Sequence, residues 1–193
     1  NFRGKVADSY LDVMSLEMFR AEFMGRQWGP KAFFIPEFNE KISAEKAPTR
    51  ELAAILVLHD VAPWLVCCNV AEMRAPYDRL EAFGYGDAEF IPYFDANSPA
   101  ATDMKNVYIS VFKRSDDQAI AFIANLSKED QTGKVAFDES RLGFPIGSLS
   151  SWRDDDVKLG VEGRGVTLQV PKSDYRMVLI KGKGKVTTQG SAG

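Results

Sequence analysis

The spacing of apolar residues changes along the chain near residue 95. Before it, apolar clusters at helical spacing alternate with short, continuous apolar runs. After it, short segments alternate apolar and polar residues with a period of two, separated by turn residues. The first pattern is typical of α/β structure and the second of antiparallel β structure. We therefore predict an α/β part at 1–95, a linker at 96–104 and a β part at 105–181.

The first part is predicted to contain three helices and two strands. Ser15, Thr49 and Asn69 are residue types that cap helix N-termini, and an apolar segment follows each of them. The continuous apolar runs 32–36 and 64–68 lie between the helices. Runs of this kind favour strands that are buried on both faces, as in a parallel sheet covered by helices. The order helix, strand, helix, strand, helix therefore predicts units of a parallel (β/α) fold.

Turn-forming residues mark the ends of several elements. Residues 39–48 are polar and are predicted as a loop. Pro76 is expected to restart the third helix and Gly84 to end it. The segment Glu162–Gly165 is predicted as a hairpin turn. The Gly- and Ser-rich tail at 182–193 has no apolar pattern, and we expect it to be disordered.

The second part is predicted to form an antiparallel β-sandwich, because seven or so short strands follow one another without an intervening helix. Its alternation begins at Val107, where every second residue is an aliphatic one. Tyr108 and Phe112 fall on the other face of the same strand. Further strands are expected around 119–124 and at Lys134–Phe137, Leu149–Trp152, Val157–Val161, Gly165–Val170 and Arg176–Lys181.

Charge and hydropathy exclude some partners. The formal net charge is −3 and the sequence pI is about 5.3, with no basic stripe, so nucleic acid is not expected as a partner. Residues 1–95 hold 10 basic and 15 acidic side chains, which makes the first part mildly acidic. No apolar run approaches the ~20 residues that span a bilayer, so no membrane span is predicted.

The chain offers few ligands for a metal ion. Cys67 and Cys68 are adjacent, and a disulfide between neighbours would be strained. In so apolar a run we predict buried small hydrophobic side chains, with a two-ligand metal site as the alternative. Asp154, Asp155 and Asp156 lack the alternating spacing of an EF-hand loop and are predicted as a solvated turn. Neither a metal nor a cofactor is therefore predicted.

Three stretches carry a resemblance to a known family: Trp28–Phe38, Leu58–Trp64 and Phe83–Phe94. Together they resemble the last barrel units and the C-terminal β-domain of bacterial glycoside hydrolase-like proteins, nearest to the β-N-acetylgalactosaminidase-like group and its uncharacterised relatives. The resemblance covers most of residues 14–181, and its motifs are short and aromatic, without an invariant catalytic signature. It implies the end of a (β/α)8 barrel followed by a β-sandwich.

The resemblance also implies a chemistry and its location. Glycoside hydrolysis uses two carboxyl groups, or one acid assisted by the substrate's acetamido group. In such a barrel the catalytic pair is expected on central strands, which would lie upstream of Asn1, so the catalytic residues are unknown here. A complete barrel alone takes about 250 residues, so the chain is expected to be the C-terminal part of a longer protein. The expected partners are a glycan and the remainder of the barrel, and the expected location is periplasmic, cell-surface or secreted.

Charged candidates for binding a sugar fall near the predicted strands. Glu37 follows the first strand, at the end where barrel chemistry is placed, and is otherwise a surface carboxylate. His59, the only histidine, could bind sugar hydroxyls next to Asp60 or act as an acid or base. Adjacent residues on a helix point in different directions, so Asp60 need not orient His59. The alternative for His59 is contact with the carbonyls at a helix end.

Aromatic and amide side chains complete the set of candidates. Trp28 and Trp64 could stack on pyranose rings through their apolar faces, although core packing is the simpler alternative. Asn69 could donate hydrogen bonds to a sugar, but its role as an N-cap already explains it.

Two further functions compete with a hydrolase fragment. A non-catalytic carbohydrate-binding or accessory protein should show a row of exposed aromatic side chains on the β-sandwich. A purely structural module should show neither that row nor two carboxylates in one cleft. An incomplete parallel sheet should also leave unpaired edges and exposed apolar surface in the first part.

Overall fold

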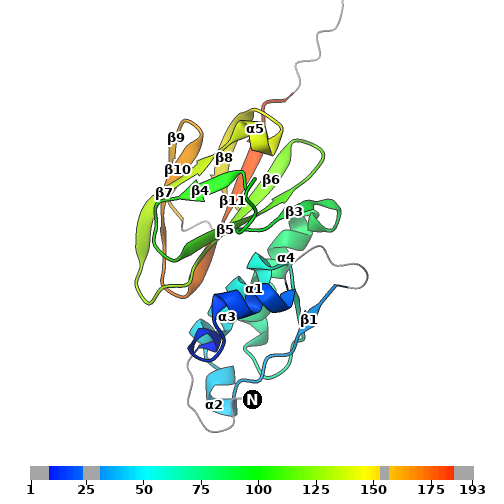
Figure 1. The fold of residues 1–193 in the computed structure, drawn as a ribbon, viewed down its shortest axis with the longest axis vertical. Helices are drawn as coiled ribbons and strands as arrows, with labels where there is room; N and C mark the ends of the chain where they lie inside the picture. The colour runs from blue at the N-terminus through cyan, green and yellow to red at the C-terminus, as the bar shows by residue number, and fades with distance from the viewer. Residues whose placement is uncertain (1–8, 24–30, 153–156, 185–193) are drawn as a thin grey trace, which may run out of the picture.

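The computed structural model describes residues 9–23, 31–152 and 157–184, and its elements form three layers. Helices lie at one end of the molecule, a five-stranded sheet in the middle and a four-stranded sheet beyond it (Figure 1). Three apolar clusters hold the layers: one within the helical part, one between the helices and the first sheet, and one between the two sheets. Among the described residues, no helix is long and apolar enough to span a membrane.

The helical part has the predicted alternation of helices and strands, but it contains one more short helix, and its second strand lies before the predicted run 64–68. The helices are α1 (Leu16–Phe23), α2 (Glu40–Ser43), α3 (Lys46–Leu58) and α4 (Val70–Phe83), with a 3₁₀ helix at Tyr10–Asp12. The strands β1 (Phe33–Phe34) and β2 (Ala62–Pro63) pair in parallel, with Phe33 opposite Ala62. Two predicted caps are confirmed, since Ser15 Oγ accepts a hydrogen bond from the Met18 N–H and Asn69 Oδ1 accepts one from the Glu72 N–H.

Three details of the helical prediction are wrong. The segment 39–48 is not a loop throughout, because it contains α2 and the start of α3. Thr49 is not the N-cap of α3; it is buried, and its hydroxyl oxygen accepts a hydrogen bond from the Asn69 N–H. Pro76 does not restart a helix, because α4 runs through it. Gly84 does end α4, as predicted, in the left-handed region at φ 80°.

The predicted burial of the two strands on both faces is also wrong. Phe34 packs on the helical cluster, but Phe33 is 60% exposed and Ile35 is 59% exposed. The run 64–68 is not a buried strand, because Trp64 is 55% exposed and Cys67 is exposed. One face of this short parallel pair is therefore buried and the other is open. All exposed large apolar side chains of the described residues except Val161 lie before residue 95.

Helix α3 joins the helical part to the sheets. Its residues 51–58 are all buried, because one side packs in the helical cluster and the other against the five-stranded sheet. Such a helix, apolar all round, belongs to the interior of a protein. At its C-terminal end, the Leu58 carbonyl accepts a hydrogen bond from the buried Ser110 hydroxyl of β5.

The rest of the chain forms two antiparallel sheets that share an apolar cluster. The five-stranded sheet has the order β3-β5-β6-β11-β8 and the four-stranded sheet the order β4-β7-β10-β9. The predicted hairpin turn is confirmed by the pairing of Glu162 with Gly165. The strands are β3 (Glu89–Ile91), β4 (Ala100–Thr102), β5 (Val107–Lys113), β6 (Gln118–Asn125), β7 (Gln131–Phe137), β8 (Ile146–Ser151), β9 (Gly160–Glu162), β10 (Gly165–Val170) and β11 (Asp174–Gly182), with α5 (Glu139–Leu142) between β7 and β8.

Two elements lie outside the predicted β part. β3 precedes residue 95 yet pairs with β5, and β4 lies within the segment 96–104 and pairs with β7. Both are three residues long, too short for an alternation to be recognised. Most of the tail, residues 185–193, lies outside the described residues.

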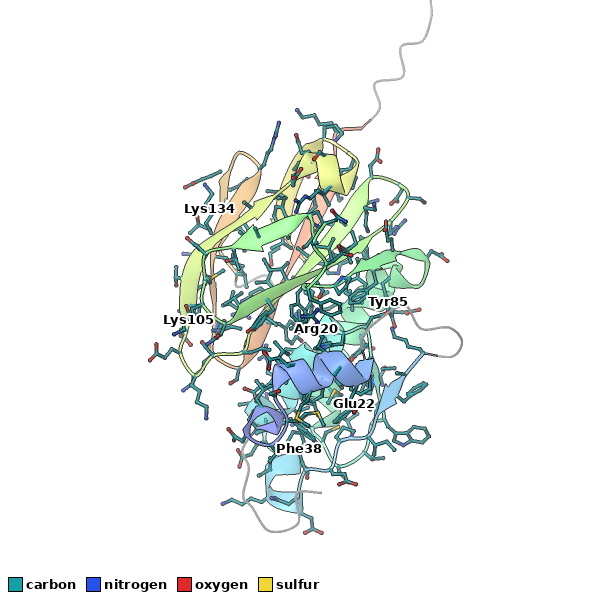
Figure 2. All side chains as sticks on the ribbon, in the orientation of Figure 1. Arg20, Glu22, Phe38, Tyr85, Lys105 and Lys134 are labelled. Atoms are coloured by element: carbon teal, nitrogen blue, oxygen red, sulfur yellow. The ribbon has the colours of Figure 1, made fainter. Side chains whose placement is uncertain are left out.

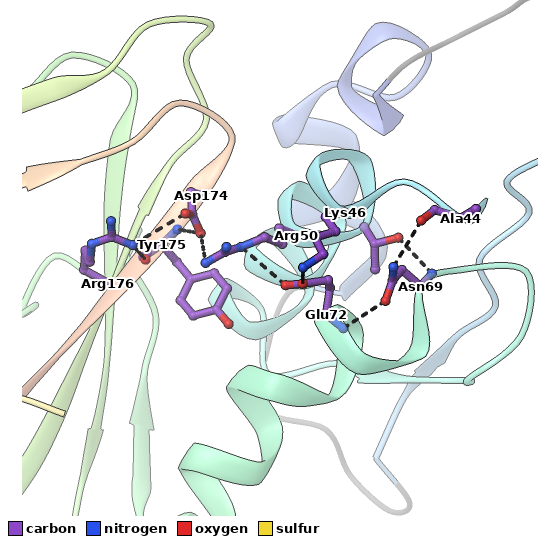
Figure 3. A network of polar contacts seen from close by, with 9 residues as sticks. Ala44, Lys46, Arg50, Asn69, Glu72, Asp174, Tyr175 and Arg176 are labelled. Carbon is purple, nitrogen blue, oxygen red and sulfur yellow. Dashed lines mark hydrogen bonds and ion pairs between the residues drawn. The ribbon is translucent and has the colours of Figure 1, made fainter. Parts of the chain in front are cut away.

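A polar network closes the interface between the helices and the first sheet (Figure 3). Arg50 of α3 donates to Asp174 of β11 at 2.9 Å, and its Nε lies 3.7 Å from Glu72 of α4. Arg176 also pairs with Asp174. The neighbouring Glu51, 6% exposed, accepts a hydrogen bond from the Ser173 hydroxyl at 2.8 Å. These contacts tie the turn before β11 to α3.

Candidate functional site

The parallel pair β1–β2 has two edges, and the sequence candidates divide between them. The carboxyl ends of the strands lead along the chain to Glu37, Trp64 and Asn69. From β1 the chain continues to α2, at the end of the molecule that lies far from the sheets (Figure 1). The amino ends of the strands follow Lys31 and the His59–Asp60 pair, next to the sheets. Ligands of open and closed parallel sheets bind at the carboxyl ends of strands.

The carboxyl edge exposes an aromatic ring and a carboxylate. Trp64 packs edge-on against Phe33, with 6.4 Å between ring centroids, and the Trp64 side chain remains exposed to solvent. Glu37 is exposed, and its backbone N–H donates to the Tyr10 hydroxyl at 2.5 Å. Burial raises the pKa of Tyr10 to about 12, so this hydroxyl stays protonated at neutral pH. Tyr10 thus fixes the backbone from which the Glu37 side chain projects.

Asn69 serves the fold at this edge. Its amide oxygen caps α4, and its amide nitrogen donates to the Ala44 carbonyl at 3.1 Å. Its backbone N–H donates to the Thr49 hydroxyl. These contacts position the loop after β2 against α3.

The adjacent cysteines lie in that loop. Cys67 is exposed and adopts φ 50°, while Cys68 is partly exposed, and both are free thiols. The prediction that both are buried small hydrophobic side chains is therefore wrong. Burial, together with the neighbouring Cys67, raises the pKa of the Cys68 thiol. Among the described residues, no group of three His, Cys, Asp or Glu side chains is placed to hold a metal ion.

The amino edge holds a buried histidine. His59 is 4% exposed, with Nδ1 2.7 Å from the Ile55 carbonyl oxygen and Nε2 3.4 Å from the Tyr93 hydroxyl. Burial lowers the pKa of His59, so the neutral ring is favoured. Since Ile55 can only accept, Nδ1 carries the proton and Nε2 accepts from Tyr93. Two roles were predicted for His59 from the sequence, and the contact of its Nδ1 with the Ile55 carbonyl, in the last turn of α3, matches the structural one.

Asp60 follows in an unusual backbone conformation. Its φ of 55° lies in the left-handed region, which Asp tolerates better than most residues. The carboxylate pairs with Lys31 at 2.5 Å, and the Lys31 ammonium also lies 4.7 Å from the centre of the Tyr85 ring. Both partners of this pair are about one-third exposed.

A pocket of about 740 Å³ opens beside this edge, between the helical part and the sheets. His59 and Asp60 line it together with residues of β3, the segment after β3, the end of β5 and α5. Glu89 and Lys113, which are opposite each other on β3 and β5, form an ion pair at 2.8 Å in its wall. Sequence reasoning missed Lys113, because only the pairing of β3 with β5 brings it there.

Two sets of candidates fall outside the described residues: Trp28, and the three acidic residues Asp154–Asp156. The aromatic row expected of a sugar-binding sandwich is not found on the described strands, where Val161 is the exposed large apolar residue. Phe112 is 1% exposed and Tyr108 is half-buried, because the helices cover this face of the five-stranded sheet.

Comparisons with known proteins found similarity in structure only. No protein-family model and no curated protein matches the chain. A GH30 endoxylanase from Clostridium papyrosolvens shares 12% identity at a TM-score of 0.46, with 80% of this chain and 42% of that chain covered. A GH30 subfamily 8 xylanase from Clostridium acetobutylicum shares 11% at a TM-score of 0.48, with 93% and 46% covered.

A GH27 β-L-arabinopyranosidase from Geobacillus stearothermophilus shares 7% identity at a TM-score of 0.40, with 70% of this chain and 31% of that chain covered. All three structures are glycoside hydrolases, and the chain spans less than half the length of each. Because every TM-score is below 0.5, these similarities support no inference about a site or a substrate.

Proposed function

We propose that the chain is the C-terminal part of a glycoside hydrolase-like protein and that it contacts a glycan at the carboxyl edge of β1 and β2. The observation that carries this proposal is the exposed ring of Trp64 at the same edge as the exposed Glu37. An aromatic face packs on the apolar face of a sugar ring, and a carboxylate accepts hydrogen bonds from its hydroxyls.

The open face of the parallel pair supports the same proposal. Phe33 and Ile35 are exposed on one face of a two-stranded parallel sheet, whereas such sheets are normally covered on both faces. The remainder of a (β/α)8 barrel, in a longer form of this chain or in another chain, would cover that face. Side chains at the carboxyl end of barrel strands line the site, which is where Trp64 stands.

The family resemblance adds to this proposal the position of the catalytic residues, the substrate class and the cellular location. The catalytic carboxylates belong to the barrel strands outside this chain, and the two-sheet part corresponds to the C-terminal β-sandwich. The substrate class is an N-acetylhexosaminide, and the protein acts in the periplasm, at the cell surface or outside the cell.

A non-catalytic carbohydrate-binding protein is the second candidate. It is favoured by the candidates at this edge, of which only Glu37 carries a carboxyl group, whereas hydrolysis ordinarily uses two. Both functions require sugar binding at Trp64, and only the first requires hydrolysis by the longer protein.

The test is binding of N-acetylhexosaminide oligosaccharides to the chain by calorimetry, followed by hydrolysis of aryl N-acetylhexosaminides by the longest form of the protein. Trp64→Ala should weaken binding about fivefold to tenfold, since an aromatic contact contributes about 1 kcal/mol. Val161→Ala, an equally exposed apolar residue on β9, serves as the control and should change nothing. Unchanged binding in Trp64→Ala would contradict the proposal, and binding without hydrolysis would select the second candidate.

A further inference from the structure

The pocket at the amino edge of β1–β2 lies at the end of the strands opposite to Trp64 and Glu37, so the proposed glycan contact does not account for it. Its volume of about 740 Å³ is within the range of about 300–1,000 Å³ that small-molecule sites occupy. Phe23, Phe90 and Ile91 of its lining belong to the apolar clusters or pack on them, which fixes this part of the wall.

The cationic groups of this pocket already have partners, and Asp95, a further carboxylate of the lining, accepts a hydrogen bond from the Asn97 N–H at 2.7 Å. Lys31 pairs with Asp60 at 2.5 Å, and Lys113 pairs with Glu89 at 2.8 Å. Arg141 donates to the Ser98 carbonyl at 2.9 Å, and its Nε lies 3.5 Å from Asp138. An anionic ligand would have to compete with these carboxylates for every one of the three cations. The pairing therefore disfavours a carboxylate, sulfate or phosphate.

Ion pairs of this kind suit hydroxyl groups. A hydroxyl donates to a carboxylate oxygen and accepts from the ammonium beside it, so it can bridge an ion pair without separating the two charges. A zwitterion such as an amino acid would have to separate an ion pair before its carboxylate could bind Lys31 or Lys113. The exposed amide of Asn97, with one acceptor and two donors, adds neutral hydrogen-bonding capacity at the rim.

Aromatic rings supply the apolar part of the wall. Phe23, Phe90 and Phe94 line the pocket, each of them half-buried. The Arg20 guanidinium lies 4.6 Å from the centre of the Phe94 ring, and the Tyr93 ring packs against it edge-on. These contacts hold Phe94 in place at the junction of α1 and the sheets. A ligand with both hydroxyl groups and an apolar ring face matches such a wall.

From this geometry we propose that the amino-edge pocket is a second binding site, for a small uncharged sugar. The ligand hydroxyls bridge the Lys31–Asp60 and Lys113–Glu89 pairs, and its apolar face lies on the phenylalanine rings. Because the pocket is lined from both the helical part and the sheets, a bound sugar holds these two parts together and stabilises the folded chain.

The test uses the chain with methyl β-galactoside, methyl β-glucoside and D-xylose as neutral probes, galacturonate as the anionic probe and glycine as the zwitterion. Binding is followed at millimolar concentrations by chemical-shift perturbation and by the thermal unfolding midpoint. At least one neutral probe should bind and raise the midpoint. Binding of none of them, or tighter binding of galacturonate or glycine, would overturn the proposal.

Matched variants locate the bound probe. Lys113→Met should weaken its binding by about tenfold, because a hydrogen bond to a charged group is lost. Lys134→Met removes another ion pair between strands, that of Lys134 on β7 with Glu162 on β9 at 3.4 Å, and should leave binding unchanged. Lys134 lies on the other side of the molecule from Tyr85, which contacts Lys31 of the pocket (Figure 2).

Two more variants keep the result interpretable. Asn97→Ala, at an exposed position in the rim, should also weaken binding and leaves the ion pairs in place. Trp64→Ala should have no effect on this site. If Trp64→Ala abolishes binding of the neutral probe while Lys113→Met and Asn97→Ala do not, the sugar binds at the carboxyl edge alone. That result would overturn this proposal and support the proposed function.

Discussion

His59 shows how one residue can satisfy a sequence pattern without playing the role that the pattern suggested. As the only histidine, next to Asp60, it invited an acid–base role. In the structure its ring is buried between the Ile55 carbonyl and the Tyr93 hydroxyl, and Asp60 pairs with Lys31 instead. The imidazole therefore organises the wall of the pocket, and its charge state affects the stability of the fold.

The pH dependence of stability should reveal this histidine. Burial lowers its pKa in the folded protein below the ordinary value of 6.5, so the unfolded chain binds the proton more readily. The stability that neutral His59 contributes is therefore present above about pH 6.5 and is lost as the pH falls below it. Between about pH 6.5 and 5, the free energy of unfolding should fall more steeply in the natural protein than in His59→Gln. The free energy of unfolding is measured by urea denaturation at each pH. The same pH dependence in both proteins would contradict the burial of a neutral His59.

At the scale of elements, the ends of helices and strands follow local rules. Asn69 and Gly84 begin and end α4 as their types predict, and the hairpin between β9 and β10 forms at its glycine-containing turn. Local rules fail where burial decides. α3 begins before Thr49, whose buried hydroxyl oxygen accepts a hydrogen bond from the Asn69 N–H. The run after β2 is exposed and pairs with no strand among the described residues.

Gly84 is a test of the local rules. It has φ 80°, and an added Cβ would lie 3.3 Å from the Arg114 guanidinium, whose Nη1 donates to the Phe83 carbonyl. Gly84→Ala should lower the free energy of unfolding by about 1–2 kcal/mol, because a left-handed backbone is unfavourable for alanine. Gly86→Ala is the matched control, since an added Cβ there meets no atom within 4 Å. A similar effect of both substitutions in urea denaturation would mean that the backbone conformation of Gly84 is not the cause.

At the scale of the whole molecule, helices and sheets form one structure. α3 is buried between the helical cluster and the five-stranded sheet, and the Arg50–Asp174 pair closes the interface at its edge. The domain boundary near residue 95 remains a prediction, and β3 connects the two sides of it by pairing with β5.

Replacement of Arg50 should weaken that interface. Arg50→Met should lower the free energy of unfolding by about 1 kcal/mol, a value reduced by the partial exposure of Arg50, whose side chain is 31% exposed. Arg74→Met breaks an exposed pair within α4 and should change stability by less than about 0.5 kcal/mol. Thermal unfolding followed by calorimetry measures both. Equal effects would show that the Arg50–Asp174 pair contributes no more than a surface ion pair.

The sequence by itself determined the elements whose signals are local: the capped helices, the alternating strands and the order of the two patterns along the chain. Tertiary structure alone decided which candidates share a site. It separated Glu37 and Trp64 from His59 and Asp60, because they lie at opposite ends of the same two strands. It also brought Lys113 and Arg141 to the pocket beside Asp60. Contacts of this kind depend on the register of strands and on the packing of helices that are far apart in sequence, and no local pattern encodes either of them.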